Sequence, residues 1–254
     1  MKKRQRVRRA LLLISFLLFP ITINYFSPYL ILQGSMEGVL AGSGLLFLGQ
    51  FLCSIALGRL FCGWLCPAGA LQELCTGIVD RSVKQRARYI KYGIWVPWLG
   101  AIIAGFAAAG GMRRVEPLYY TDGGISVSAP ANYVIYFGVI LLLLILAFTV
   151  GRRGACHTVC WMAPFMVLGG LLGRALRIPA LQMKPAQQGC MSCKACDKAC
   201  PMSLPVQSMV RQGDMRHAEC ILCGNCADVC PRHVIEMGFR RAPKRIEPAA
   251  GMNR

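Results

Sequence analysis

Four long apolar stretches occupy most of the first 150 residues of the chain. They cover residues 10–32, 39–57, 92–109 and 131–150, and each is close to the ~20 residues that a helix needs to cross a membrane. A cleaved signal peptide has a shorter apolar segment and a small-residue cleavage site, so we expect the first stretch to be a retained helix that Pro20 only kinks. The pattern predicts an α-helical membrane protein with four transmembrane helices.

Basic residues are distributed unevenly between the segments that join these stretches. Six Lys and Arg precede the first stretch, six lie in residues 59–91 and fifteen follow Gly151, whereas residues 33–38 hold none and residues 112–130 hold two. The positive-inside rule then places both termini in the cytoplasm and predicts a multi-pass protein of the inner cell membrane. This asymmetry explains most of the net charge of +18, and no nucleic-acid recognition motif accompanies it, so we expect no nucleic-acid partner.

The chain also contains a weak internal repeat. The first two stretches lead into RLFCGWLC at residues 59–66, and the last two lead into RGACHTVC at residues 153–160. Each copy has a basic residue three positions before a Cys-x3-Cys pair, which indicates two hairpins of the same orientation related by a parallel repeat. An apolar segment too short to cross a membrane follows each copy, at residues 68–79 and 162–172, and we expect both to be helices at the cytoplasmic interface.

Cysteine usage adds a metal-binding signal to the membrane pattern. Eight of the 14 cysteines lie in two segments, CMSCKACDKACP and CILCGNCADVCP. Both have the Cys-x2-Cys-x2-Cys-x3-Cys-Pro spacing of bacterial two-cluster ferredoxins, in which the fourth cysteine of each copy ligates the other cluster. The spacing therefore predicts one 4Fe–4S cluster on Cys190, Cys193, Cys196 and Cys230, and a second on Cys200, Cys220, Cys223 and Cys226.

Other uses of these cysteines explain the pattern less well. Structural zinc also uses Cys-x2-Cys, but it would leave the third and fourth cysteines of each copy without a role. A disulfide framework would need an oxidising compartment, whereas the charge distribution places these thiols in the reducing cytoplasm. Two clusters that carry one electron each form a relay rather than a site for an organic substrate. Five basic residues near the ligands would raise the potentials, dock an acidic partner or simply solvate the surface: Lys194, Lys198, Arg211, Arg216 and Arg232.

The repeated Cys-x3-Cys pairs form a second set of candidate site residues: Cys62, Cys66, Cys156 and Cys160. Their spacing places both thiols of a pair on one face of a helix. If the two hairpins pack together, the four thiols converge on a metal, a third redox centre or reversible disulfides; the alternative is that they are buried packing residues. His157 is either a further ligand or a donor to a backbone carbonyl, and we expect Cys53 and Cys75 to be packing residues.

Three motifs together resemble a known family. GRLFCGWLCPAGALQEL at residues 58–74, CHTVCWMAPF at residues 156–165 and the tandem ferredoxin motifs resemble the polyferredoxin-type membrane proteins that include NapH, MauN and the C-terminal half of NosR. The resemblance extends from the first apolar stretch to about Glu236, with Trp161 where the family has Pro. It implies four membrane helices, two cytoplasmic clusters and a quinol-linked or maturation-linked role in electron transfer.

These patterns predict a membrane-bound iron–sulfur protein that relays electrons between the membrane quinone pool and a partner redox protein or enzyme complex. It would be an electron-transfer subunit rather than an independent enzyme, and a quinone is a candidate cofactor beside the two 4Fe–4S clusters. The alternative is an accessory maturation factor that supplies electrons or handles metal for the cofactor assembly of another enzyme. A transporter fits the helices, but none of the four stretches carries a clear ionisable pair at its middle.

The predicted fold is therefore two membrane hairpins with a small cytoplasmic α+β two-cluster ferredoxin-like domain. We expect six segments in order: a first hairpin (1–58), a loop with Cys-x3-Cys-Pro (59–91), a second hairpin (92–150), the second Cys-x3-Cys with its interfacial helix (151–184), the ferredoxin-like domain (185–240) and a basic tail (241–254).

Overall fold

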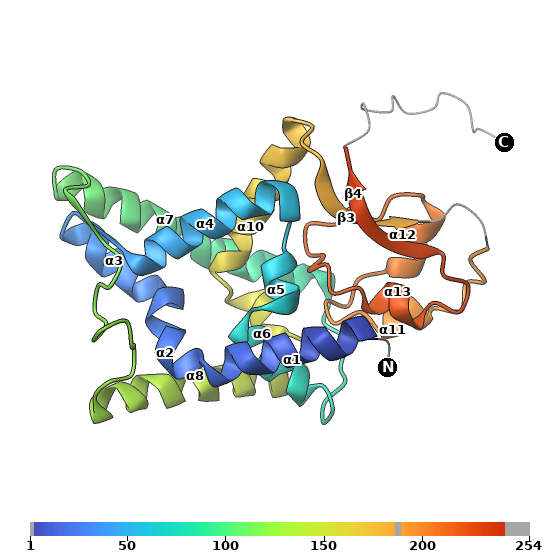
Figure 1. Cartoon of the computed structure of the whole chain (residues 1–254), viewed down its shortest axis with the longest axis horizontal. Helices are drawn as coiled ribbons and strands as arrows, with labels where there is room; N and C mark the ends of the chain where they lie inside the picture. The colour runs from blue at the N-terminus through green and yellow to red at the C-terminus, as the bar shows by residue number, and fades with distance from the viewer. Residues whose placement is uncertain (1–2, 186–188, 242–254) are drawn as a thin grey trace.

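A bundle of helices forms one end of the molecule and a small α+β domain forms the other (Figure 1). The structure is a computed structural model that describes residues 3–185 and 189–241. The first helix, α1 (Lys3–Leu17), lies along the bundle with its amino end beside the α+β domain (Figure 1). The predicted basic tail lies outside the described residues except for Arg241.

The first apolar stretch is broken rather than continuous. Three short segments follow α1: α2 (Phe19–Thr22), the 3-10 helix η1 (Ile23–Phe26) and α3 (Pro28–Met36). The chain bends by 59° between α1 and the α2–η1 segment. Pro20 and Pro28 each lie in the first turn of a new helix, where the missing N–H costs little, and Ser27 before Pro28 is extended. The prediction that Pro20 only kinks a single first helix is therefore wrong.

The second stretch differs from the prediction, whereas the third and fourth match it closely. Residues 39–57 form β1 (Val39–Ala41) and α4 (Gly42–Leu57), and the later stretches form α7 (Arg88–Ala108), preceded by the 3-10 helix η2 (Gln85–Ala87), and α8 (Pro130–Thr149). The strand β1 pairs in parallel with β2 (Arg114–Glu116) in the loop after α7. This pairing takes three residues from the start of the second stretch and shortens its helix to 16 residues.

Two helices of the described chain are long and apolar enough to cross a membrane, Gln85–Ala108 and Pro130–Thr149, and the bent α1–η1 segment would be a third. On α8, Val134, Ile135 and Phe137 are at least 60% exposed. Exposed apolar side chains along a long helix are what a lipid-facing surface requires. The protein is therefore a helical membrane protein with two or three candidate spans, and a four-span topology stays a prediction.

The two Cys-x3-Cys motifs adopt similar local structures. Each forms a short helix followed by a longer one: α5 (Leu60–Trp64) and α6 (Pro67–Cys75) in the first half, α9 (Gly154–Thr158) and α10 (Met162–Ala175) in the second. The helix α6 packs on α1 of its own half and on α8 of the other half, whereas α10 packs mainly on α4 of the first half. A Cβ atom at Gly169 would lie 1.9 Å from the Ser54 Oγ atom, so small residues allow α10 and α4 to approach closely. That α6 and α10 lie at the membrane interface stays a prediction.

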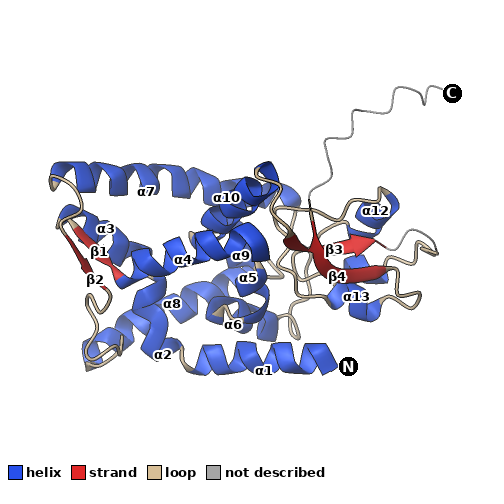
Figure 2. Ribbon diagram, turned by 45° about the horizontal axis from the view of Figure 1, so that its top comes forward, coloured by secondary structure: helices blue, strands red, loops and turns tan. Residues whose placement is uncertain are grey.

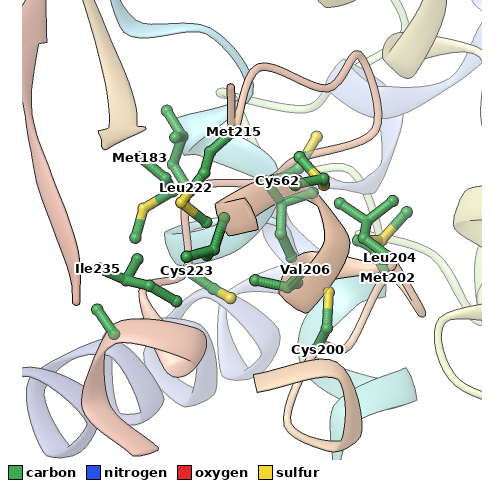
Figure 3. Close-up of a cluster of buried hydrophobic side chains, with 14 of the residues drawn as sticks. Cys62, Met183, Cys200, Met202, Leu204, Val206, Met215, Leu222, Cys223 and Ile235 are labelled. Atoms are coloured by element: carbon green, nitrogen blue, oxygen red, sulfur yellow. The ribbon is translucent and has the colours of Figure 1, made fainter. Parts of the chain in front are cut away.

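The C-terminal part is the expected small α+β domain. Its antiparallel sheet pairs β3 (Ala180–Pro185) with β4 (Ile235–Arg240), and its three helices are α11 (Ala195–Lys198), α12 (Val206–Arg211) and α13 (Asn225–Val229) (Figure 2). Its buried core continues into the bundle, because Cys62 of α5 belongs to the same group of buried side chains as Cys200 and Cys223 (Figure 3). The α+β domain is therefore joined to the bundle by a shared apolar core.

Candidate functional site

The two ferredoxin motifs fold into nearly identical loops. In each motif the residue before the second cysteine and the residue after it are left-handed: Ser192 and Lys194 in the first, Leu222 and Gly224 in the second, with φ between 52° and 75°. This conformation turns successive backbone N–H groups toward one side of the loop. A short helix then carries the third cysteine, Cys196 on α11 and Cys226 on α13.

Two cavities in the α+β domain are each lined by four cysteines. The first is lined by Cys190, Cys193, Cys196 and Cys230, and the second by Cys200, Cys220, Cys223 and Cys226. Each set takes three cysteines from one motif and one from the other. This grouping is the same as the one predicted from the spacing, and four thiolates around one cavity are the ligand set of a 4Fe–4S cluster.

The environment of the sulfur atoms suits a cluster rather than free thiolates. Burial raises the pKa of Cys220 to about 11 and that of Cys200 to about 12, so a bound cation is needed to ionise them near neutral pH. Backbone N–H groups two positions after Cys220 and Cys223 donate to those sulfurs. Hydrogen bonds of this kind tune the potentials of iron–sulfur clusters.

The second ferredoxin motif lies directly on the first Cys-x3-Cys motif. A Cβ atom at Gly63 would lie only 2.1 Å from the Ile221 carbonyl oxygen, so the two backbones are in contact. The Trp64 indole N–H donates to the Leu222 carbonyl oxygen at 3.0 Å. The Gln5 side-chain amide of α1 donates to the Cys223 carbonyl oxygen at 2.9 Å. The cluster-binding loop is therefore held against the membrane bundle by apolar and polar contacts.

The structure brings the four cysteines of the Cys-x3-Cys pairs together. Cys62 and Cys156 share one buried core, while Cys66 and Cys160 belong to the adjoining core of the bundle. Burial raises the pKa of the Cys66 thiol, and so would ionisation of any of the other three thiols. The neighbouring His157 is completely buried, and neither ring nitrogen has a hydrogen-bond partner among the described residues, so the predicted bond to a backbone carbonyl is not formed.

The comparisons with known proteins agree with this geometry. The family described as a 4Fe–4S binding domain matches residues 40–85, and the 4Fe–4S dicluster domain matches residues 189–235. The ferredoxin-type protein NapH of Escherichia coli K12 is 27% identical over 240 residues, which cover 89% of this chain and 78% of NapH. The methylamine utilization ferredoxin-type protein MauN of Methylorubrum extorquens AM1 is 28% identical, covering 84% of this chain and 74% of MauN.

This chain is similar to the ferredoxin-type proteins NapH and MauN and carries two matches to 4Fe–4S binding domains. The regulatory protein NosR of Pseudomonas aeruginosa PAO1 is 29% identical over 67% of this chain, but the match covers 24% of NosR. The chain likewise spans 57% of YccM from Escherichia coli K12 and 62% of an uncharacterized Methanocaldococcus jannaschii protein, less than two thirds of either. No solved structure matches the chain.

Two groups of buried ion pairs in this ferredoxin-type protein were not predicted from its sequence. Glu219 accepts from Lys91 at 2.6 Å and from Arg59 at 2.7 Å, and all three side chains are almost completely buried. Burial opposes ionisation of the Glu219 carboxyl, but the two cations outweigh it and lower its pKa to about 2. Glu73 is shared in the same way by Arg8 at 2.8 Å and Arg153 at 2.5 Å.

The basic residues that the sequence placed near the ferredoxin ligands lie mostly on the surface of this ferredoxin-type domain. Lys194, Lys198 and Arg211 are exposed, and Arg216 is paired with Asp214 at 2.5 Å. The only sequence signals for the buried groups were Glu219 directly before a ligand cysteine and the repeated basic residue before each Cys-x3-Cys pair.

Proposed function

We propose that this membrane protein relays electrons between the membrane quinone pool and a partner redox protein through two 4Fe–4S clusters. When bound, each cluster supplies a one-electron carrier. The residues that would hold the clusters are the four cysteines of each cavity, Cys190, Cys193, Cys196 and Cys230 for the first and Cys200, Cys220, Cys223 and Cys226 for the second.

The observation that carries this proposal is the direct contact between the second ferredoxin loop and the bundle. Backbone contact at Gly63 and the Trp64 hydrogen bond fix the loop that contains Cys220 and Cys223 on the membrane motif. A domain that only bound metal in the cytoplasm would not need a cluster-binding loop at this position. The positive-inside rule supports the cytoplasmic placement of both the domain and the termini, since basic residues concentrate on that side.

A cavity beside the second cluster site supports a quinone as the membrane-side reactant. It has a volume of about 550 Å³ and lies between α1, α6 and the ferredoxin-type domain, with Cys200 in its wall. Leu13 and Leu74, which are 48% and 61% exposed, give it an apolar side next to the membrane helices. The lining also carries ionic groups, including Glu73 and Lys198.

This combination of walls suits a molecule with a polar ring and an apolar tail. Oxidation of a quinol releases two electrons and two protons, and a one-electron carrier accepts the electrons one at a time. The lining includes the Glu73 and Asp80 carboxylates, which are held by ion pairs with arginines and would form the charged surroundings of the polar ring.

A deletion experiment separates this function from the alternative role in maturation. The partner is first identified by co-purification with the full chain in mild detergent. The partner isolated from a strain without this protein should then contain its own cofactor in full and should turn over with an artificial electron donor, but not with quinol in membranes. A partner that lacks its cofactor would overturn the proposal in favour of a maturation factor.

A further inference from the structure

Four thiols from the two halves of the bundle lie beside the ferredoxin-type domain, and Cys62, Cys66 and Cys156 are buried while Cys160 is partly buried. Cys62 and Cys156 are part of the core shared with that domain, and Cys66 and Cys160 are in the adjoining core of the bundle. The Cys66 thiol interacts electrostatically with each of the other three. All four are free thiols, so neither pair is closed by a disulfide.

The surroundings of these thiols carry a surplus of buried positive charge. Each of the two ion-pair groups has two cations and one carboxylate: Arg59 and Lys91 with Glu219, and Arg8 and Arg153 with Glu73. The four cationic side chains are at most 3% exposed. Each group therefore leaves one positive charge unpaired in the protein interior, which is costly unless a further anion lies nearby.

The two arginines that precede the Cys-x3-Cys pairs act on thiols of both halves. Arg59 interacts with Cys62, Cys156 and Cys160, and Arg153 interacts with Cys66 and Cys156. Each arginine is therefore close to both halves. An iron–sulfur cluster held by four thiolates has a net charge of about −2 when oxidised, which balances the surplus of the two groups. Arg59 also acts on Cys220, and Arg8 and Arg153 act on Cys223, so these cations face the second ferredoxin cluster site as well.

Unsatisfied donors around the thiols point to the same conclusion. The Nε and Nη2 atoms of Arg59 and both ring nitrogens of His157 have no hydrogen-bond partner in the described part of the chain, although the two residues are 3% and 0% exposed. Buried polar groups of native proteins nearly always have partners. The Gln72 side-chain amide is a further donor, 3.7 Å from the Cys156 Sγ atom. Sulfide and thiolate sulfurs accept N–H hydrogen bonds, so a cluster would offer acceptors to Arg59, to Gln72 and to the single ring N–H of a neutral His157.

We propose that Cys62, Cys66, Cys156 and Cys160 hold a third iron–sulfur cluster, one pair of thiolates from each half, between the bundle and the ferredoxin-type domain. Among residues 3–185 and 189–241, no three Cys, His, Asp or Glu side chains are close enough to share a single metal ion. A cluster fits this spacing better, because its four thiolates are shared among two or more irons and extend over a larger volume than the ligands of one ion. The same wide spacing holds for the ferredoxin cysteines.

The family match at residues 40–85 includes two other cysteines, which the structure keeps apart from this site. Cys53 is exposed on α4, and burial alone raises the pKa of Cys75. Neither residue is among the thiols that act on Cys66. They therefore serve as matched controls for the four proposed ligands.

Iron and acid-labile sulfide per chain test the inference in the full protein, purified anaerobically and reconstituted in nanodiscs. Two ferredoxin clusters alone give about eight irons, and a third cluster raises this to about ten or twelve. Replacing one thiolate from each half, Cys66→Ser with Cys160→Ser, should return iron and sulfide to about eight, while Cys53→Ser with Cys75→Ser should change neither. Eight irons in the wild-type protein, or an iron content that the Cys66→Ser and Cys160→Ser changes do not alter, would overturn the inference.

A second variant keeps the inference testable if the double substitution prevents folding. The full chain with Cys193→Ser and Cys223→Ser loses one ligand of each ferredoxin cluster but none of the third. It should retain about two to four irons with equal sulfide and a distinct Mössbauer signal. Protein that is folded but free of iron, or that carries zinc without sulfide, would refute the third cluster. These tests count iron and sulfide at the third site. They can therefore fail without contradicting the proposed relay through the two ferredoxin clusters, which the electron-exchange experiment tests.

Discussion

Substitution of Gly63 by alanine tests the contact between the ferredoxin loop and the bundle. The added Cβ atom would lie 2.1 Å from the Ile221 carbonyl oxygen and 3.4 Å from the Cys223 backbone nitrogen. The obstacle is backbone rather than the flexible end of a side chain, so the two surfaces must separate by about 1 Å to reach ordinary contact. That separation would stretch the 3.0 Å hydrogen bond from Trp64 to the Leu222 carbonyl beyond useful length.

The expected cost is the sum of two contributions. Overpacking of a tight contact costs about 1–3 kcal/mol, and loss of one hydrogen bond costs about 1 kcal/mol. The substitution should therefore weaken docking by roughly 2–4 kcal/mol. This is less than the free energy of unfolding of a typical domain, so the chain should remain folded and keep its iron. Thermal unfolding in detergent should shift down by roughly 5–10 °C, and hydrogen exchange should increase in the peptides that contain Trp64 and Leu222.

A matched control is available in α4. A Cβ atom at Gly49 would meet nothing within 4 Å, so Gly49→Ala should leave docking unchanged and should favour the helix by about 1 kcal/mol. If Gly63→Ala unfolds at the wild-type temperature and shows wild-type exchange near Leu222, the ferredoxin loop does not rest on the bundle as described.

Three further predictions concern topology, pH and the cavity. Reporter fusions after Lys184 should report cytoplasm and those near Asp122 the opposite side, and the reverse pattern would refute the orientation. Burial opposes ionisation of the Glu73 carboxyl, but Arg153 and Arg8 lower its pKa, so its contribution to stability should be present above about pH 4.3 and lost as the pH falls through the lowered value. The unfolding temperature should fall between pH 7 and pH 3 in the wild type and should fall less in Glu73→Gln. Equal pH profiles of the two proteins would contradict this role of Glu73. Leu74→Trp, inside the cavity, should slow the reaction with quinone several-fold and leave the iron content unchanged. Ile78→Trp, outside the lining, should not slow it. Equal rates in the two variants would contradict quinone binding in this cavity.

The ferredoxin cysteines could be grouped from sequence because their geometry is local. Each motif fixes three ligands within seven residues, and the left-handed residues at Lys194 and Gly224 turn both loops in the same way. The helices α7 and α8 could also be located within a few residues, since each is an uninterrupted apolar run. The local sequence pattern is sufficient to predict a segment whose conformation depends mainly on its own residues.

The first two apolar stretches could not be predicted correctly because other influences outweigh their hydropathy. Backbone restrictions at Pro20 and Pro28 end one helix and begin another. Pairing of Val39 with Arg114, far along the chain, converts the start of the second stretch into a strand. The prolines can be read from the first stretch, whereas the strand pairing cannot be read from the second, because its partner lies outside that stretch.

The buried ion groups were missed for a related reason. Arg59 and Glu219 are separated by 160 positions, and Arg153 and Glu73 by 80. A single carboxylate in a polar segment looks like a surface residue until the fold buries it. Two features marked this region in the sequence: Glu219 directly before a ligand cysteine, and an arginine three positions before each Cys-x3-Cys pair.

Electron exchange between quinone and the ferredoxin clusters is the most direct test of the proposed relay. Anaerobic protein in nanodiscs would be reduced chemically and mixed rapidly with a quinone, while the visible absorption and the paramagnetic signal of the clusters are followed. We expect the clusters to be reoxidised within one turnover, and more slowly in Leu74→Trp. Clusters that react with soluble oxidants but remain reduced in the presence of quinone would contradict a role between the quinone pool and a partner protein.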